Sequence, residues 1–221
     1  MLYSNQKDKV LSIVQVLPVT NQSLKIASDI LLDGGVVCIP TDTVYGLSAI
    51  ATNEDAVKKI FHIKNRSNDT PLPIFINNTE ILNNLTSQIL TPEIMKLTST
   101  FWPGPLTIVL KKSDLIPEVT VSGLNTAGFR IPNHRVPINL CELTKSPLTA
   151  TSANISGNLP ATNAKMASDQ FKNSRLDLIL DDGETTLSVP SSIVDMSQPN
   201  ERMIREGAIS MEQIKSILHS G

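Results

Sequence analysis

Three segments rich in small hydroxyl and amide side chains coincide with the ends of apolar stretches in this chain. They read PTDTVYG (residues 40–46), PLTATSANISG (147–157) and VPSSIVD (189–195). Cations stand in three other segments, KNR (64–66), GFRIP (128–132) and MIREG (203–207). Hydroxyls and amides can orient a small polar molecule, and the arginine fork donates two parallel hydrogen bonds to a carboxylate or a phosphate. Together these segments predict a pocket for a polar, strongly anionic ligand.

Each of these segments also has a purely structural interpretation. Hydroxyls that follow a strand often close a turn by bonding to nearby backbone. Lys64 and Arg66, at the end of a predicted helix, would complement the helix dipole. Taken singly, each residue is more often structural than functional. The combination of three such loops with three cation segments favours a binding site, although composition alone does not name its ligand.

Several other kinds of site are missing from the sequence. It contains no GxxxxGK[ST] phosphate loop, no GxGxxG and no HExxH. His62, His134 and His219 are isolated from one another and from the cysteines, so the sequence predicts no zinc centre. TSANISG lacks the GxSxG pattern of a nucleophile elbow, and no pair of carboxylates stands out as an acid–base dyad.

The composition is that of a folded protein with little charge bias. Of 221 residues, 40% are hydrophobic and 18% are charged, which is enough apolar surface for a core. A net charge of −2 argues against a protein whose main work is gripping nucleic-acid backbone. The sequence has no signal peptide and no run of about 18 apolar residues. With Cys38 and Cys141 far apart, we expect a cytoplasmic protein with reduced thiols.

Helical and apolar extended patterns mix along the whole chain. Helices are predicted at 23–35, 54–66, 91–102, 136–145 and 211–220, and strands at 10–19, 36–40, 72–76, 105–110, 127–132, 147–151, 176–180, 191–196 and 202–206. Asn53 and Ser210 are predicted N-caps, and Gly34 is placed to end a helix in the left-handed conformation. We therefore expect a single α/β domain over residues 1–221, with a large twisted mixed sheet flanked by helices.

Seven motifs, in order along the chain, resemble those of the YrdC/TsaC family of threonylcarbamoyl-AMP synthases. They are PTDTVYGL, KNRSNDTPLPIFI, FWPGPLTIVL, GFRIPNH, TATSANISG, SSIVD and IREGAIS, and the resemblance runs from residue 20 to 213. SANISG by itself would be a weak signal, whereas seven motifs in the same order are specific. Longer family members have a histidine at the position of Phe75 and an extra C-terminal domain, so the chain resembles the short, single-domain type. The implied fold is a twisted α/β sheet with a concave basic face, similar to the dihydroxybutanone-phosphate-synthase-like fold.

The resemblance implies a nucleotidyltransferase reaction. L-threonine, bicarbonate or carbon dioxide, and ATP would give threonylcarbamoyl-AMP and pyrophosphate, with Mg²⁺ accompanying the ATP. A downstream transferase complex would then move the threonylcarbamoyl group onto the adenosine next to the tRNA anticodon. The protein itself would bind tRNA weakly at most, because its net charge is −2. The competing interpretation is a YrdC-like module that binds nucleotide or RNA without catalysis, as a maturation or ribosome factor.

The resemblance also assigns roles to individual residues. Lys64, Arg66 and Arg130 correspond to the catalytic cations. The L-threonine contacts would be Thr43, Arg130, Ser152 and Ser191. The ATP contacts would be Lys64, Arg66, Thr70, Thr126, Asn154, Thr162 and Arg205. No residue is assigned to a metal, and no tightly bound organic cofactor is expected.

Overall fold

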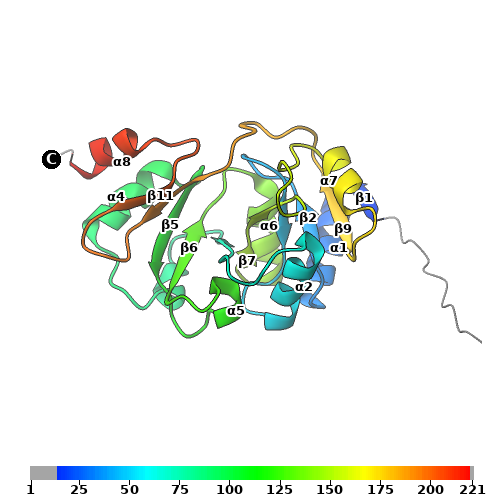
Figure 1. Ribbon diagram of the computed structural model, residues 1–221, viewed down its shortest axis with the longest axis horizontal. Helices are drawn as coiled ribbons and strands as arrows, with labels where there is room; N and C mark the ends of the chain where they lie inside the picture. The colour runs from blue at the N-terminus through cyan, green and yellow to red at the C-terminus, as the bar shows by residue number, and fades with distance from the viewer. Residues whose placement is uncertain (1–13, 220–221) are drawn as a thin grey trace, which may run out of the picture.

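The strands of the computed structural model, which describes residues 14–219, form two mixed sheets (Figure 1). The first sheet has the order β1 (Gln15–Pro18), β9 (Leu178–Asp181), β2 (Val37–Ile39), β3 (Gly46–Ser48) and β8 (Thr151–Ser152). The second has the order β11 (Arg202–Arg205), β10 (Ser192–Asp195), β5 (Leu106–Lys111), β6 (Thr126–Arg130), β4 (Ile74–Phe75) and β7 (Leu148–Thr149). The α/β class and the mixed strand directions are confirmed.

The single large sheet predicted from the sequence is divided into two, and the chain passes between them from β3 to β4, from β7 to β8 and from β9 to β10, most abruptly at Ala150. β7 pairs with β4 of the second sheet, and β8 pairs with β3 of the first. Only Ala150 separates these two short strands, and a single bridge between Ile50 and Leu148 also joins the sheets. The predicted strand at 147–151 is therefore two strands. This crossing brings the TSANISG loop to the boundary between the sheets.

Helices cover both faces of the first sheet and one side of the second. They are α1 (Asn21–Leu32), α2 (Glu54–Lys64), α3 (Leu82–Leu85), α4 (Pro92–Phe101), α5 (Glu118–Val121), α6 (Arg135–Thr144), α7 (Ala164–Phe171) and α8 (Met211–Leu218). Helix α1 packs against α6, and α4 packs against α8 (Figure 1). The five predicted helices are present. Helices α3, α5 and α7 were not predicted: α3 and α5 have only four residues each, and the buried face of α7 consists of Ala164, Ala167 and Phe171 alone.

Strands β2 and β9 are buried on both faces, which explains why their sequences are apolar at successive positions. Val37 and Leu178 lie in a core with α1 and α6, whereas Cys38 and Ile179 lie in a core with α2 and α7. Alternate residues of a strand point to opposite faces, so a sheet covered on both faces needs apolar residues at every position. A further core is formed by apolar residues of the second sheet together with those of α4 and α8.

The helix ends follow the sequence signals. Asn53 caps α2, with its side-chain oxygen accepting from the Ala56 amide at 3.1 Å. Asn65, at φ 49°, ends the same helix between Lys64 and Arg66. Ser210 forms the expected capping box with Gln213, and Gly34 has the left-handed φ of 75°. No helix within residues 14–219 is long and apolar enough to cross a membrane.

Candidate active site

A cavity of about 410 Å³ opens where loops of the two sheets meet, and we call it the central cavity. Its walls come from the β2–β3 loop, the segment before β4, the β7–β8 crossing, and strands β5, β6, β10 and β11. The predicted residues among its lining are Thr43, Arg66, Thr70, Arg130, Ser152, Ser191 and Arg205. Residues from six sequence motifs therefore converge on one cavity.

Arg130, at the end of β6, is the most buried cation of the central cavity. Its Nε donates to the Gly104 carbonyl at 2.9 Å, and its two terminal nitrogens donate to Thr43 Oγ1 at 3.1 Å and Asp42 Oδ1 at 2.5 Å. The guanidinium also lies 5.7 Å from the centre of the Phe75 ring. A guanidinium has five N–H donors, so two remain for a ligand. Two N–H groups are what bidentate recognition of a carboxylate requires.

The Asp42–Arg130 ion pair is almost completely buried, with side-chain exposures of 6% and 5%. Burial lowers the pKa of the Arg130 guanidinium, and the neighbouring Asp42 carboxylate opposes that shift. The group stays cationic, because arginine does not lose its proton in proteins. Asp42 is therefore the partner that allows a charged arginine to lie at the bottom of this cavity. Its second oxygen, Oδ2, is buried without a hydrogen bond among the described residues.

Buried hydroxyls line the cavity on two sides of Arg130. In the β2–β3 loop, Thr41 Oγ1 lies 3.0 Å from Thr43 Oγ1 and donates to the Val44 carbonyl at 2.8 Å. On strand β5, Thr107 Oγ1 lies 3.0 Å from Ser191 Oγ. Each pair restrains the direction of its hydroxyls, and Thr43 Oγ1 also accepts from Arg130 of the second sheet.

Arg205 supports the Ser191 segment from the edge strand β11. Its Nε and one terminal nitrogen donate to the Ser191 carbonyl at 3.0 Å and 2.8 Å, and the latter nitrogen also donates to Ser191 Oγ at 3.2 Å. The other terminal nitrogen carries two N–H groups that have no such contact. Arg205 thus positions Ser191 and presents positive charge to the same cavity.

A second cavity of about 390 Å³, which we call the side cavity, adjoins the central one and shares Arg66, Thr70 and Ser152 with it. Lys64 lines it but is only 2% exposed, and its ammonium donates to the carbonyls of Ser152 and Asn154. Burial, aided by the charge of Arg66, lowers the pKa of Lys64 to about 7.

The side chains of Ser152 and Asn154 are bonded to each other, and the Asn154 side chain also accepts from Lys64. Ser152 Oγ donates to Asn154 Oδ1 at 2.6 Å, and the same oxygen accepts from Lys64 Nζ at 3.3 Å. Asn154 Nδ2 donates to the carbonyls of Ile155 and Asn158 at 3.0 and 2.9 Å. The amide therefore shapes its own loop.

Arg66 stands between the two cavities. One terminal nitrogen donates to Thr151 Oγ1 at 3.1 Å, and the other approaches the carbonyls of Thr70 and Pro71 at 3.3 and 3.5 Å. The Thr70 hydroxyl itself bonds to the exposed Asp69 carboxylate at 3.1 Å. Arg66 is thus placed to contact ligands in both cavities.

Two predicted nucleotide contacts line neither of these cavities. Thr126 begins β6, four residues before Arg130, where it pairs with Lys111. An extended strand advances about 3.4 Å per residue, so Thr126 lies roughly 13 Å along the strand from Arg130. Thr162 Oγ1 is directed to the Met166 sulfur at 3.4 Å, at the start of α7. Both assignments stay predictions made from the resemblance alone.

The sequence reasoning missed Asp42 and Thr107, which contact Arg130 and Ser191 in the candidate site. A signal existed for each: burying Arg130 without a partner would be costly, and Thr107 is a polar residue in the apolar strand PLTIVL. Neither signal identifies the contact partner, which lies more than 80 positions away in both cases.

The described residues contain no group of three or more His, Cys, Asp or Glu side chains that could hold a metal ion. Asp69 is the acidic residue among the linings of the two cavities, and its carboxylate is exposed. Mg²⁺ is commonly bound through substrate phosphates and water, with one or two carboxylates. This donor set therefore fits a metal that arrives with a nucleotide better than a resident metal.

Comparisons with known proteins point to one family. The Sua5/YciO/YrdC family model, described as "Telomere recombination", matches residues 29–207. Threonylcarbamoyl-AMP synthase of Pyrococcus abyssi (strain GE5 / Orsay) is 40% identical over 195 residues, which cover 88% of this chain and 57% of that protein. A putative threonylcarbamoyl-AMP synthase of Methanocaldococcus jannaschii is 36% identical over 186 residues, covering 83% of this chain and 85% of that protein.

A solved structure supports the same relationship. Pyrococcus abyssi Sua5 complexed with L-threonine matches with a TM-score of 0.87 and 38% identity, over 94% of this chain and 60% of that one. The chain thus spans somewhat more than half the length of its P. abyssi relative. The range matched by the family model, residues 29–207, includes the residues that line both cavities.

Proposed function

Because the chain belongs to the Sua5/YciO/YrdC family, we propose that it is a threonylcarbamoyl-AMP synthase. It joins L-threonine, bicarbonate or carbon dioxide, and ATP, and it releases pyrophosphate. The observation that carries the proposal is the convergence of Arg66, Arg130 and Arg205 with buried hydroxyls on one cavity. A relative complexed with L-threonine supports it.

The amino acid binds in the central cavity. Its carboxylate accepts from the two N–H groups of Arg130 that have no partner among the described residues. Asp42 holds the guanidinium in place through its own hydrogen bond. Thr43 and Ser191 line the same space from different segments of the chain, and their hydroxyls orient the small polar substrate. The Phe75 ring and Ile193 supply apolar surface for its methyl group.

The nucleotide extends from the central cavity toward the side cavity. Arg66 and Arg205 are placed to contact its phosphates, and Lys64 lies behind Ser152 and Asn154 at the base of the side cavity. In the reaction the threonine amine attacks carbon dioxide and loses a proton, which gives a carbamate. A carbamate oxygen then attacks the α-phosphorus, and the bond to pyrophosphate breaks. The cationic residues align the carbamate with ATP and offset the charge that develops on pyrophosphate. This role does not require a pair of carboxylates that act as acid and base.

Mg²⁺ would enter with ATP and supply charge neutralisation at the phosphates. Delivery of the product to a downstream threonylcarbamoyl-transferase complex, its use on tRNA and a cytoplasmic location belong to the same proposal. The competing interpretation, a module without catalysis, has no observation in its favour: the predicted cations Lys64, Arg66, Arg130 and Arg205 are all present at the two cavities.

The experiment that tests the proposal is a set of omissions. We expect pyrophosphate release from ATP to need L-threonine and bicarbonate together, and to fall to background when either is left out. Pyrophosphate release that is equally fast without an amino acid would point to hydrolysis of ATP to AMP and pyrophosphate and would refute the proposal.

A further inference from the structure

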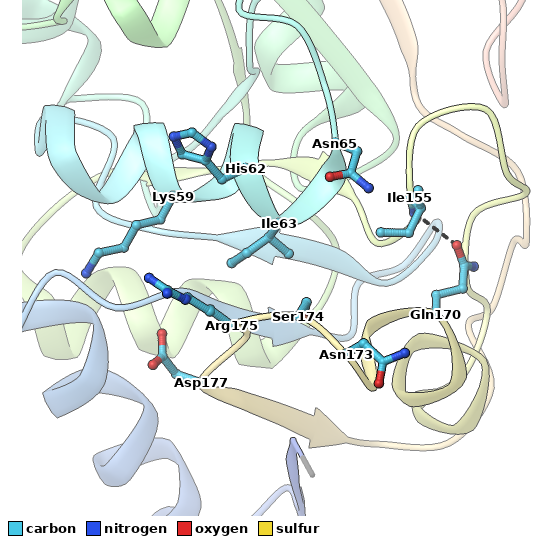
Figure 2. Close-up of a pocket in the computed structure, with 10 residues that line it drawn as sticks. All are labelled: Lys59, His62, Ile63, Asn65, Ile155, Gln170, Asn173, Ser174, Arg175 and Asp177. Atoms are coloured by element: carbon cyan, nitrogen blue, oxygen red, sulfur yellow. Dashed lines mark hydrogen bonds between the residues drawn. The ribbon is translucent and has the colours of Figure 1, made fainter. Parts of the chain in front are cut away.

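A third and larger cavity, of about 880 Å³, lies between α2 and the segment that joins α7 to β9 (Figure 2). We call it the rear cavity. It shares no lining residue with the central cavity, and it shares only Asn65 with the side cavity. Asn154 lines the side cavity, whereas its neighbour Ile155 lines the rear cavity.

Two cations and one carboxylate gather at one end of the rear cavity (Figure 2). Lys59 Nζ is held by the Gly34 carbonyl at 2.7 Å. Asp177 Oδ2 accepts from the Val36 amide at 2.8 Å, so this carboxylate is occupied in joining β9 to β2. No hydrogen bond or ion pair within residues 14–219 holds the Arg175 guanidinium. With two cations, Lys59 and Arg175, and one carboxylate, Asp177, this end of the rear cavity has an excess of positive charge.

The remaining walls of the cavity are polar and small. Asn65, Gln170, Asn173 and Ser174 supply amides and a hydroxyl, and Ile63 and Ile155 supply the apolar floor. A volume of about 880 Å³ is within the range of roughly 300–1,000 Å³ that small-molecule sites occupy. A guanidinium and an ammonium beside neutral donors are suited to a phosphate group.

We propose that the rear cavity is a second, non-catalytic binding site for a small phosphate-bearing ligand, with Arg175 and Lys59 as its anion contacts. Its concave shape favours a free small molecule over a nucleic-acid backbone, which would need an open basic surface. The proposal does not depend on the reaction assigned to the central cavity.

A ligand in the rear cavity could affect the loop that carries Ser152 and Asn154. Gln170 of α7 clamps that loop at two points: its Oε1 accepts from the Ile155 amide at 3.0 Å, and its Nε2 donates to the Leu159 carbonyl at 3.0 Å. The Ser156 amide also donates to the Lys64 carbonyl at 2.9 Å. A ligand that contacts Gln170 and Asn65 therefore touches both segments that position Lys64 and Asn154.

Isoleucine methyl groups can test this proposal, because they report separately on the two sites. Ile63 and Ile155 line the rear cavity, whereas Ile193 and Ile204 line the central cavity. In the full chain labelled at isoleucine methyls, inorganic phosphate should shift Ile63 and Ile155 in a saturable way. The Arg175→Gln variant should need at least about tenfold more phosphate for the same shift, because it lacks one charge-assisted contact.

Lys172→Gln is the matched control, because it removes the same charge from an exposed residue near the end of α7 that does not line the cavity. It should leave the phosphate titration of Ile63 and Ile155 unchanged. The proposal is wrong if these methyls do not move, if both variants weaken binding equally, or if a short RNA moves them and phosphate does not. Shifts of Ile193 and Ile204 alone would place phosphate in the central cavity and also refute it.

Discussion

At the residue scale, the site depends on hydroxyls and cations whose directions are fixed by other side chains. Thr43 is held by Thr41 and by Arg130, and Ser191 is held by Thr107 and by Arg205. A hydroxyl that is fixed before binding loses less entropy when a ligand arrives. This preorganisation distinguishes these hydroxyls from ones that only close a turn.

The first prediction concerns Thr43 and Ser191, which both line the central cavity. Single alanine substitutions should raise the KM for L-threonine with little change in ATP binding. Distant, independent sites add within about 0.5 kcal/mol, whereas two contacts to one ligand are coupled. A double-mutant cycle on L-threonine affinity should therefore depart from additivity. Strict additivity with unaltered affinity, together with lower melting temperatures, would mean that both hydroxyls are structural.

The second prediction concerns Lys64, whose pKa is lowered to about 7 by burial. Phosphates bound nearby favour the charged ammonium and raise this pKa. At pH 8 the free protein has mostly neutral Lys64, so ATP binding should take up close to one proton there. At pH 5.5 the ammonium is already formed, and Lys64 should take up almost none.

Calorimetry of ATP binding in buffers of different ionisation enthalpy measures this proton uptake. Lys64→Arg is the control, because arginine keeps its proton at every accessible pH. The uptake at pH 8 that is due to residue 64 should disappear in this variant. Equal proton uptake by the wild type and by Lys64→Arg would remove Lys64 from the nucleotide site.

At the element scale, the site residues lie where helices and strands end or cross. Helix α2 ends at Asn65, in the left-handed conformation, which separates Lys64 from Arg66 and directs them to different partners. The crossing at Ala150 places Ser152 beside Gly46 of β3. Sequence patterns predicted α2 and its Asn53 cap, because these signals are local. They did not predict the split at Ala150, since pairing partners of two-residue strands are set by contacts far along the chain.

The third prediction uses Gly207, which follows β11. A Cβ atom at this position would lie 2.3 Å from the Pro190 carbonyl oxygen and 2.8 Å from the Ser191 carbonyl carbon. These are backbone atoms, so Gly207→Ala should displace the segment that carries Ser191. We expect a higher KM for L-threonine, measured by pyrophosphate release, and a lower melting temperature.

Gly123 offers the control for Gly207. A Cβ atom there would have no neighbour within 4 Å, and its φ of 76° suits asparagine. Gly123→Asn should therefore leave the KM for L-threonine unchanged. An unchanged KM in Gly207→Ala as well would show that the Ser191 segment does not need this close approach.

At the scale of the whole molecule, the two sheets meet at a buried ion pair. Asp42 belongs to a loop of the first sheet, and Arg130 ends β6 of the second. The sequence predicted the α/β class, and the family resemblance named seven residues that line the central cavity. It did not predict this pair, because a separation of 88 residues leaves no local pattern.

The fourth prediction follows from that burial. Arg130→Leu would leave the Asp42 carboxylate buried without a partner, so the free energy of unfolding should fall by about 3–5 kcal/mol. Urea denaturation measures it. Arg135→Leu is the control, because the Arg135 side chain is 61% exposed and its ion pair with Asp182 should contribute no more than about 1 kcal/mol. Equal, small losses in both variants would mean that the sheets do not depend on the buried pair.

The central claim is that one continuous site joins an amino acid, a one-carbon unit and a nucleotide. Mass spectrometry of the product made from ATP, L-threonine and ¹³C-bicarbonate tests it most directly. We predict one product that contains AMP, one threonine and one ¹³C atom, formed in equal amount with pyrophosphate. A threonine–AMP product without ¹³C, or free AMP with no threonine attached, would contradict the account.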